Sequence, residues 1–364
     1  MADLFAPLSF SRGPAMKNRF MLAPMTNQQS HADGRLSPEE FDWLTRRAEG
    51  GFGLVMTCAA HVQPAGQGFP GQLGAFADDL VEGLAHLAAG IRERGALSSL
   101  QLHHAGYRAP SALVGTPVCP SDHEETGARG LTLDEVRQLR DDFIAGARRA
   151  EGAGFDGVEI HGAHGYILAE FLSPEVNRRT DHYGGDAANR ARLILEIIDG
   201  IRAQSRSDFQ IGLRLSPERY AQRLDEVLAL AGRVMADGKI DYLDMSLWDV
   251  AKEPEDERFR GRSLLSYFTE LDRGSVRLGA AGKIMTGTAA ASVLDAGCDF
   301  VSIGRAAILR HDFPARVREQ HDFASPSLPV STAHLAGESV SPSFVDYLRT
   351  WPDFVAQPTS GFGR

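Results

Sequence analysis

Short apolar runs alternate with amphipathic segments along nearly the whole chain. The apolar runs predict eight β-strands, at residues 19–25, 53–57, 97–102, 157–160, 210–215, 241–245, 275–280 and 300–303. The segments between them have helical periodicity and predict helices at residues 38–49, 79–94, 133–152, 189–203, 225–236, 264–271, 289–296 and 313–319. Pro38 directly after Ser37, and Asp134 shortly after Thr132, are typical of helix starts.

A strand followed by a helix, repeated eight times, predicts an α/β fold in which helices cover a parallel sheet. Eight repeats favour closure of that sheet into a single (β/α)8 TIM barrel. An open doubly wound sheet is the alternative, because alternation alone does not establish that the first and last strands pair. We expect one barrel over residues 1–324 and a C-terminal extension over residues 325–364.

Two long segments interrupt the alternation. Residues 103–130, rich in Pro, Gly and Ser, follow the third strand, and residues 173–186 follow the fourth. In a barrel both segments leave the carboxyl ends of strands, where active sites are built. The tail after residue 325 ends in an aromatic stretch from Phe344 to Phe354. We expect this tail to pack outside the barrel or on a partner subunit of a homo-oligomer.

The chain has a formal net charge of −10 and no basic run, which argues against nucleic acid or an anionic membrane surface as a partner. Its start lacks the pattern of a signal peptide, and no apolar stretch reaches the roughly 18 residues that a membrane span needs. The cysteines Cys58, Cys119 and Cys298 are scattered, which fits a reducing cytoplasm and gives neither a disulfide framework nor a metal knuckle. We therefore expect a cytoplasmic protein whose partner is a small molecule.

Residues 154–190 contain the residues with the most evident chemistry. His161 stands at the end of the fourth predicted strand, and His164 and Tyr166 follow within five residues. A turn there would bring two imidazoles and a phenol to one mouth of the barrel, giving two hydrogen-bond donors for an anionic oxygen and one weak acid. The His-x-x-His pair would also suit a metal such as zinc, which needs a third ligand. Glu159 is not adjacent to either histidine, and spacing alone leaves metal and non-metal roles open.

Six segments, in order along the chain, resemble the Old Yellow Enzyme family of FMN-dependent ene-reductases. They are NRFMLAPMT, GLVMTCAA, QLHHAG, HGAHGY, NRRTDHYGGDAANR and IGLRLSPE, and the match covers nearly the whole chain. The resemblance implies FMN as cofactor, NADH or NADPH as reductant, and no metal. It also implies hydride transfer from flavin N5 to the activated C=C bond of an α,β-unsaturated carbonyl or nitro compound.

The site residues implied by the resemblance fall into a substrate group and a flavin group. His161 and His164 would hold the substrate oxygen, and Tyr166 would donate a proton to the substrate. The implied contacts to the flavin ring are Pro24, Met25, Thr26, Ala59, Gln101 and Arg214. The Gln101 amide has both a donor and an acceptor for the pyrimidine edge, and the Arg214 guanidinium would stabilise negative charge near flavin N1 and O2.

The loops after the last two predicted strands are expected to bind the FMN phosphate. Gly282 and Gly304 allow close backbone approach there, and Lys283 and Arg305 add positive charge. The family often has a Gly-Gly or similar turn followed by a hydrophobic residue where this chain has Gly282-Lys283, so the chain departs from the family pattern at this loop.

Two other functions stay as alternatives at this stage. One is a metal-dependent barrel hydrolase that uses the His-x-x-His pair, and the other is a barrel that keeps flavin but only binds ligands. An iron–sulfur flavoenzyme resembling the dienoyl-CoA reductases would need cysteines after the barrel, and none follows Cys298.

Overall fold

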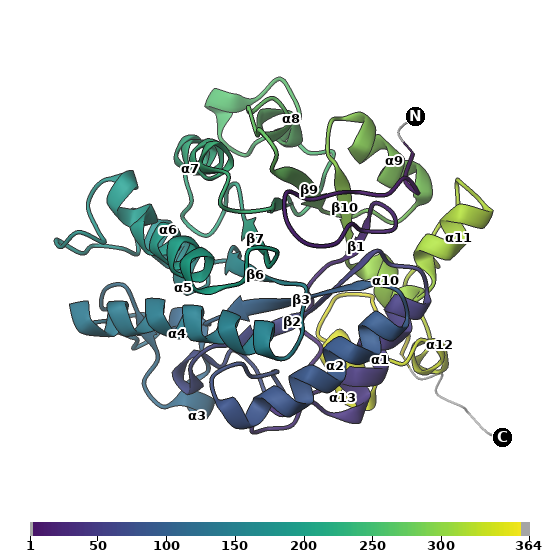
Figure 1. The fold of residues 1–364 in the computed structure, drawn as a ribbon, viewed down its shortest axis with the longest axis horizontal. Helices are drawn as coiled ribbons and strands as arrows, with labels where there is room; N and C mark the ends of the chain where they lie inside the picture. Colours follow the sequence, from purple (N-terminus) through teal and green to yellow (C-terminus); the bar gives the residue numbers. More distant parts are fainter. Residues whose placement is uncertain (1–2, 358–364) are drawn as a thin grey trace.

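The computed structural model describes residues 3–357, and a closed barrel of eight parallel strands lies at its centre (Figure 1). The strands are β1 (Phe20–Leu22), β2 (Leu54–His61), β3 (Leu97–His103), β6 (Gly157–Gly162), β7 (Gln210–Leu215), β8 (Tyr242–Ser246), β9 (Arg277–Ala281) and β10 (Phe300–Ile303). β1 pairs with both β2 and β10, which closes the sheet. The predicted (β/α)8 TIM barrel is confirmed, and the open-sheet alternative is wrong.

Helices surround the barrel and follow its strands in turn. They are α1 (Pro38–Glu49), α2 (Val81–Glu93), α4 (Leu133–Gly152), α6 (Ala187–Gln204), α7 (Leu224–Asp237), α8 (Leu264–Thr269), α9 (Gly287–Asp295), α10 (Arg305–Leu309) and α11 (Phe313–Glu319). The Ser37 hydroxyl accepts a hydrogen bond from the Glu40 amide, and Thr132 forms a capping box with Glu135. Within residues 3–357, no helix combines the length and apolar character needed to cross a membrane.

Two strand ends differ from the prediction by more than two residues, and both differences shape the carboxyl end of the barrel. β1 stops at Leu22 rather than at residue 25, because Pro24 has no N–H to continue the ladder. β2 continues past residue 57 to His61, and its pairing with β3 changes register between Met56 and Ala59. The shifted register sets Ala59 beside Gln101 at the barrel mouth.

Two aromatic rings fill the amino end of the barrel opposite glycines. The Tyr242 and Phe300 rings meet edge to face, with centroids 5.7 Å apart. A Cβ atom on Gly212 would lie 2.1 Å from the Tyr242 ring, and one on Gly279 would lie 2.0 Å from the Phe300 ring, so only glycine leaves room for them. Leu8 of the N-terminal segment packs against the same cluster. This end of the barrel is therefore occupied by apolar side chains.

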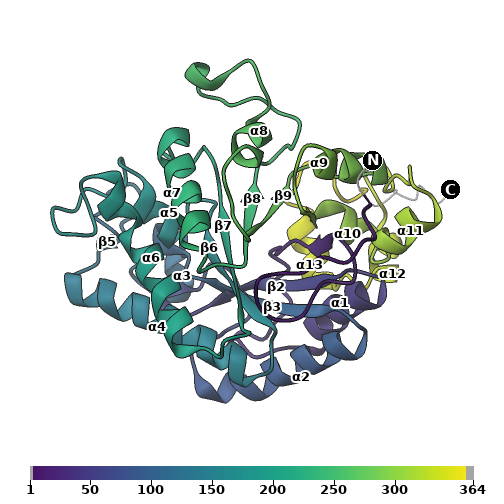
Figure 2. The ribbon, with the colours of Figure 1, turned by 45° about the horizontal axis from the view of Figure 1, so that its top comes forward.

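Shorter elements sit in the loops at the carboxyl ends of the strands and in the tail. They are η1 (Pro64–Gly66), η2 (Asp78–Leu80), η3 (Gly106–Arg108), α3 (Ser111–Val114), β4 (Val118–Cys119), β5 (Arg129–Gly130), α5 (Ile167–Leu172), η4 (Glu257–Phe259), α12 (Thr332–Gly337) and α13 (Pro342–Leu348). Figures 1 and 2 both show α12 and α13 beside α1. The Phe344 ring lies 5.6 Å from that of Trp43, and His334 Nε2 lies 2.8 Å from the Leu309 carbonyl oxygen. The described part of the tail therefore packs on its own barrel, while residues 358–364 lie outside the described chain. The division of the chain at residue 324 stays a prediction.

Candidate active site

The predicted trio lies on one short turn, residues 161–166, which we call the donor turn. His161 is near the end of β6, His164 follows with a left-handed φ of 62°, and Tyr166 directly precedes α5. The His161 ring centroid is 5.1 Å from that of His164 and 5.1 Å from that of Tyr166, both edge to face. The fold thus brings the three side chains together, and their individual roles stay predictions.

Backbone hydrogen bonds assign the tautomer of His161. The Ala163 amide donates to His161 Nδ1 at 3.2 Å, so Nε2 is the nitrogen that holds the proton in the neutral ring. Burial, followed by the neighbouring His164 and His103, holds the pKa of His161 well below its ordinary value. Burial and Arg214 lower the pKa of His164 to about 3. At neutral pH both imidazoles are therefore uncharged hydrogen-bond donors rather than cations.

His164 and Tyr166 have further contacts that fix their positions. The His164 amide donates to Ser216 Oγ at 3.0 Å, and His164 Nε2 lies 2.7 Å from Ser246 Oγ. Burial raises the pKa of the Tyr166 phenol, while the charge of Arg108 acts in the opposite direction. The phenol is consequently protonated at neutral pH and can act as a weak acid.

Beneath the donor turn lies a buried polar cluster, which we call the floor: Gln101, Glu159, Arg214 and Asp244. The four residues come from the adjacent strands β3, β6, β7 and β8. Gln101 Nε2 donates to Glu159 Oε1 at 2.8 Å, and Arg214 Nη1 lies 3.0 Å from Asp244 Oδ2. Among the residues described, Arg214 Nε and Glu159 Oε2 are buried without a hydrogen-bond partner.

The floor contains one cation and two carboxyl groups. Burial and the charge of Asp244 raise the pKa of Glu159 to about 8, and burial also raises the pKa of Asp244. Arg214 opposes both shifts, because a buried carboxylate is tolerated only beside a positive charge. The floor therefore keeps a guanidinium facing the carboxyl end of the barrel, with Glu159 protonated at neutral pH.

An open cavity of about 640 Å³ lies next to the floor, between β1 and the loops after β8, β9 and β10. Seven of the ten predicted flavin contacts line this cavity: Pro24, Met25, Arg214, Gly282, Lys283, Gly304 and Arg305. Three predicted contacts do not line it. Ala59 and Gln101 are neighbours across the β2–β3 pairing, and Thr26 follows Met25 on the segment after β1.

At the far end of this cavity are the two predicted phosphate loops. A Cβ atom on Gly282 would lie 2.7 Å from the Asp249 amide nitrogen, so this position needs glycine to pass the neighbouring loop. Lys283 Nζ lies 3.0 Å from Asp249 Oδ2, and half of the lysine side chain is exposed. Arg305 opens α10, and its guanidinium lies 5.8 Å from the Trp351 ring. The phosphate contacts themselves stay predictions.

Two further histidines, His103 and His104, lie at the end of β3, and the sequence assigned neither of them. His104 is buried and its Nδ1 accepts a hydrogen bond from the Gly106 amide at 3.1 Å, which is a structural role. His103 Nδ1 lies 3.0 Å from Gln72 Nε2, and its ring centroid is 4.4 Å from that of Tyr166. Within residues 3–357, no group of three or more His, Cys, Asp or Glu side chains is arranged to hold a metal ion.

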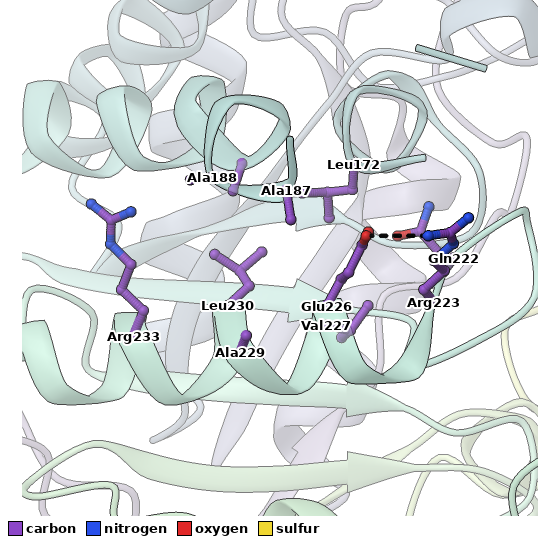
Figure 3. A pocket seen from close by; sticks show the side chains of 11 residues that line it. Leu172, Ala187, Ala188, Gln222, Arg223, Glu226, Val227, Ala229, Leu230 and Arg233 are labelled. Atoms are coloured by element: carbon purple, nitrogen blue, oxygen red, sulfur yellow. Dashed lines mark ion pairs between the residues drawn. The ribbon is translucent and has the colours of Figure 1, made fainter. Parts of the chain in front are cut away.

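A second hollow, of about 750 Å³, lies outside the barrel between α5, α6 and α7 (Figure 3). Its walls are mainly apolar, including Leu172, Val227 and Leu230, and Glu226 in it forms an ion pair with Arg223. None of the predicted site residues lines this hollow, so it is separate from the chemistry at the barrel mouth.

The structure adds four residues to the site that sequence reasoning missed. Ser246 ends β8, Trp248 follows it, and Trp351 comes from the tail; all three line the cavity. Asp244 completes the floor. Asp244 and Ser246 were detectable in principle, because they are polar residues at the carboxyl end of a predicted strand. Trp351 had no such signal, since no local pattern connects the tail with β1.

Comparisons with known proteins agree with this geometry. The model of the NADH:flavin oxidoreductase / NADH oxidase family matches residues 3–323. A probable NADH-dependent flavin oxidoreductase of Bacillus subtilis, YqiG, is 36% identical over 328 residues, which cover 87% of this chain and 88% of the relative. NADH:fumarate oxidoreductase of Klebsiella pneumoniae is 32% identical over 86% of this chain, which spans only 36% of that longer protein. The solved structure of an old yellow enzyme homologue from Zymomonas mobilis has a TM-score of 0.80 and 28% identity, covering 95% of this chain and 99% of that one.

Proposed function

Because the chain belongs to the NADH:flavin oxidoreductase / NADH oxidase family, the Old Yellow Enzyme family, and so uses FMN with NADH or NADPH, we propose that it reduces activated C=C bonds. The substrates would be α,β-unsaturated carbonyl or nitro compounds. The observation that supports this proposal best is the donor turn. There the ring centroids of His161, His164 and Tyr166 lie 5.1 to 6.4 Å from one another.

The cavity beside the floor suits the flavin. Arg214 Nε and Glu159 Oε2 are buried polar atoms without partners in the described chain, and a pyrimidine edge would satisfy them. Pro24, Met25 and Thr26 would line one side of the ring. Ala59 and Gln101 would meet it from β2 and β3, and the pairs Gly282–Lys283 and Gly304–Arg305 would hold the phosphate. When bound, FMN supplies the hydride.

His161 and His164 would hold the oxygen of the substrate. Both are neutral donors, and His161 directs its proton from Nε2 because Nδ1 is already an acceptor. Two fixed hydrogen bonds to a carbonyl or nitro oxygen draw electron density from the conjugated C=C bond. The carbon distal to that oxygen then becomes electrophilic.

Tyr166 would complete the reaction by giving its phenolic proton to the carbon next to the oxygen-bearing group. Its partly buried phenol is already protonated, so it can act as a general acid without first taking up a proton. The metal-dependent hydrolase does not suit these residues, because the His-x-x-His pair lacks a third ligand among residues 3–357.

Anaerobic mixing tests the proposed function. The protein, reduced with NADPH and free of oxygen, is mixed with 2-cyclohexenone or with a nitroalkene. We expect the flavin to be reoxidised and one saturated product to form for each NADPH consumed, while cyclohexanone leaves the flavin reduced. A reduced flavin that reacts with oxygen but with neither compound would contradict the proposal and favour a barrel that only binds such ligands.

A further inference from the structure

Arg108 lies over the donor turn and was not among the predicted site residues. It ends η3, in the loop after β3. Its guanidinium carbon is 4.9 Å from the centroid of the Tyr166 ring and 5.8 Å from that of Tyr220. Arg108 Nη1 also donates a hydrogen bond to the backbone carbonyl of His164. One arginine therefore contacts both the phenol and the turn that presents it.

This arginine has no ion-pair partner among residues 3–357; its contacts are the two aromatic rings and the His164 carbonyl. The charge of Arg108 acts to lower the pKa of the buried Glu170 carboxyl group, whose Oε1 accepts a hydrogen bond from the Tyr107 amide at 2.9 Å. Burial, the larger influence, holds the pKa of Glu170 well above its ordinary value, and Glu170 forms no ion pair with Arg108. The positive charge of Arg108 is thus available to the donor turn.

The other groups that face Tyr166 are three histidines and two tyrosines. They are His103 from β3, His161 and His164 from the donor turn, Tyr220 from the loop after β7 and Tyr347 from α13. Burial lowers the pKa of each of these three histidines. Arg108 is consequently the cation next to the phenol.

We propose that Arg108 is a positioning residue for the proton transfer, which stabilises the negative charge that develops on the Tyr166 oxygen. The inference rests on the proposed function. In that step the O–H bond of Tyr166 breaks, and the proton bonds to the substrate carbon through the electron pair left by hydride addition. Tyr166 becomes a phenolate, which solvent reprotonates. A cation about 5 Å from the ring favours the phenolate over the phenol, although its exposure to water weakens the effect.

A purely structural role is the competing explanation, because the bond from Arg108 to the His164 carbonyl also supports the left-handed turn at His164. Two substitutions separate the roles. Arg108→Gln keeps a hydrogen-bond donor but removes the charge, and Arg108→Lys keeps the charge. Arg262→Gln is a matched control, since Arg262 is also stacked on a tyrosine, 3.7 Å from the Tyr267 ring, but lies just before α8.

The experiment measures anaerobic reoxidation of the reduced holoenzyme by 2-cyclohexenone across pH, and flavin reduction by saturating NADPH. We expect Arg108→Gln to slow flavin reoxidation by the enone roughly tenfold at pH 7. The alkaline limb of the pH–rate profile, which reflects ionisation of Tyr166, should move upward by about half to one pH unit. Arg108→Lys should retain most of the rate of reoxidation by the enone and leave the alkaline limb of the pH–rate profile unchanged. Flavin reduction should be unchanged in both variants, and Arg262→Gln should match the wild type throughout.

Two results would overturn the inference. One is an enone rate in Arg108→Gln equal to that of the wild type. The other is slowing of both half-reactions with no shift of the alkaline limb, which would indicate that Arg108 only supports the turn. The proposed function has its own failure: it is contradicted if Tyr166→Phe reacts with the enone as fast as the wild type. If Tyr166→Phe is slow, adding Arg108→Gln to it should produce no further slowing, and a further tenfold loss would contradict the inference.

Discussion

The donor turn and the floor lie next to each other at the barrel mouth but are built in opposite ways. The donor turn takes its three side chains from residues 161–166, and all three are neutral at neutral pH. The floor takes Gln101, Glu159, Arg214 and Asp244 from four adjacent strands, and it contains a buried ion pair.

The proposed function accounts for this contrast by the charge that each region would meet. The oxygen and carbon atoms of the substrate are uncharged before the reaction. Uncharged hydrogen-bond donors and an uncharged acid can contact them without the cost of removing a charged group from water. A flavin that accepts hydride gains negative charge near its pyrimidine edge, and a fixed guanidinium stabilises that charge. The same burial that keeps the donor turn neutral makes the floor depend on Arg214. We therefore expect substitutions in the floor to affect stability first and those in the donor turn to affect ligands and chemistry first.

The largest effect on stability is expected from Arg214→Met. The Arg214 and Asp244 side chains are 4% and 0% exposed, and removing one partner of a buried pair leaves an uncompensated charge. We expect the free energy of unfolding of the apoprotein, measured in urea, to fall by about 3–5 kcal/mol. The control Arg277→Met removes a half-exposed arginine that pairs with Asp299 on the barrel surface, and should cost at most about 1 kcal/mol. Equal losses in the two variants would refute the contrast between the regions.

The same variant has a predicted pH dependence. Without Arg214, the folded-state pKa values of Glu159 and Asp244 rise further, because the positive charge that opposed the effect of burial is gone. At a pH between its unfolded-state and folded-state pKa values, such a carboxyl group is protonated in the folded protein and ionised in the unfolded chain. The free energy of unfolding therefore falls as pH rises through this range. The loss caused by Arg214→Met should therefore be larger at pH 8 than at pH 5. A loss that grows as pH falls would contradict this assignment of the floor.

A smaller and different effect is expected from His164→Ala in the donor turn. We expect phenols, which would place their oxygen on His161 and His164, to give a long-wavelength charge-transfer band with the flavin. Loss of one donor to a charged oxygen should weaken their binding by about 1.5–3 kcal/mol, which is roughly tenfold to a hundredfold. His86→Ala, on the exposed face of α2, should leave the titration unchanged. An unchanged dissociation constant in His164→Ala would remove His164 from the oxygen site.

The sequence predicts the donor turn better than it predicts the floor. His161, His164 and Tyr166 are contiguous, so recognising one strand and one turn was enough to bring them together. Glu159 and Asp244 are not predicted as site residues from the sequence, because bringing them into one cluster requires the register of β6, β7 and β8. The tail gave no signal for Trp351, whose place in the cavity depends on packing of α12 and α13 against the barrel. The eight strands were predictable because buried parallel strands are continuous apolar runs.

We propose that Tyr166 donates the proton, while the rest of the site binds the flavin and the substrate oxygen. Tyr166→Phe tests it most directly, because phenylalanine keeps the ring that packs against His103 and Arg108 and removes only the hydroxyl. In anaerobic stopped-flow traces at pH 7, we predict that reoxidation by 2-cyclohexenone slows by about a hundredfold or more, while flavin reduction by NADPH keeps its wild-type rate. Equal enone traces for the two proteins would contradict the account.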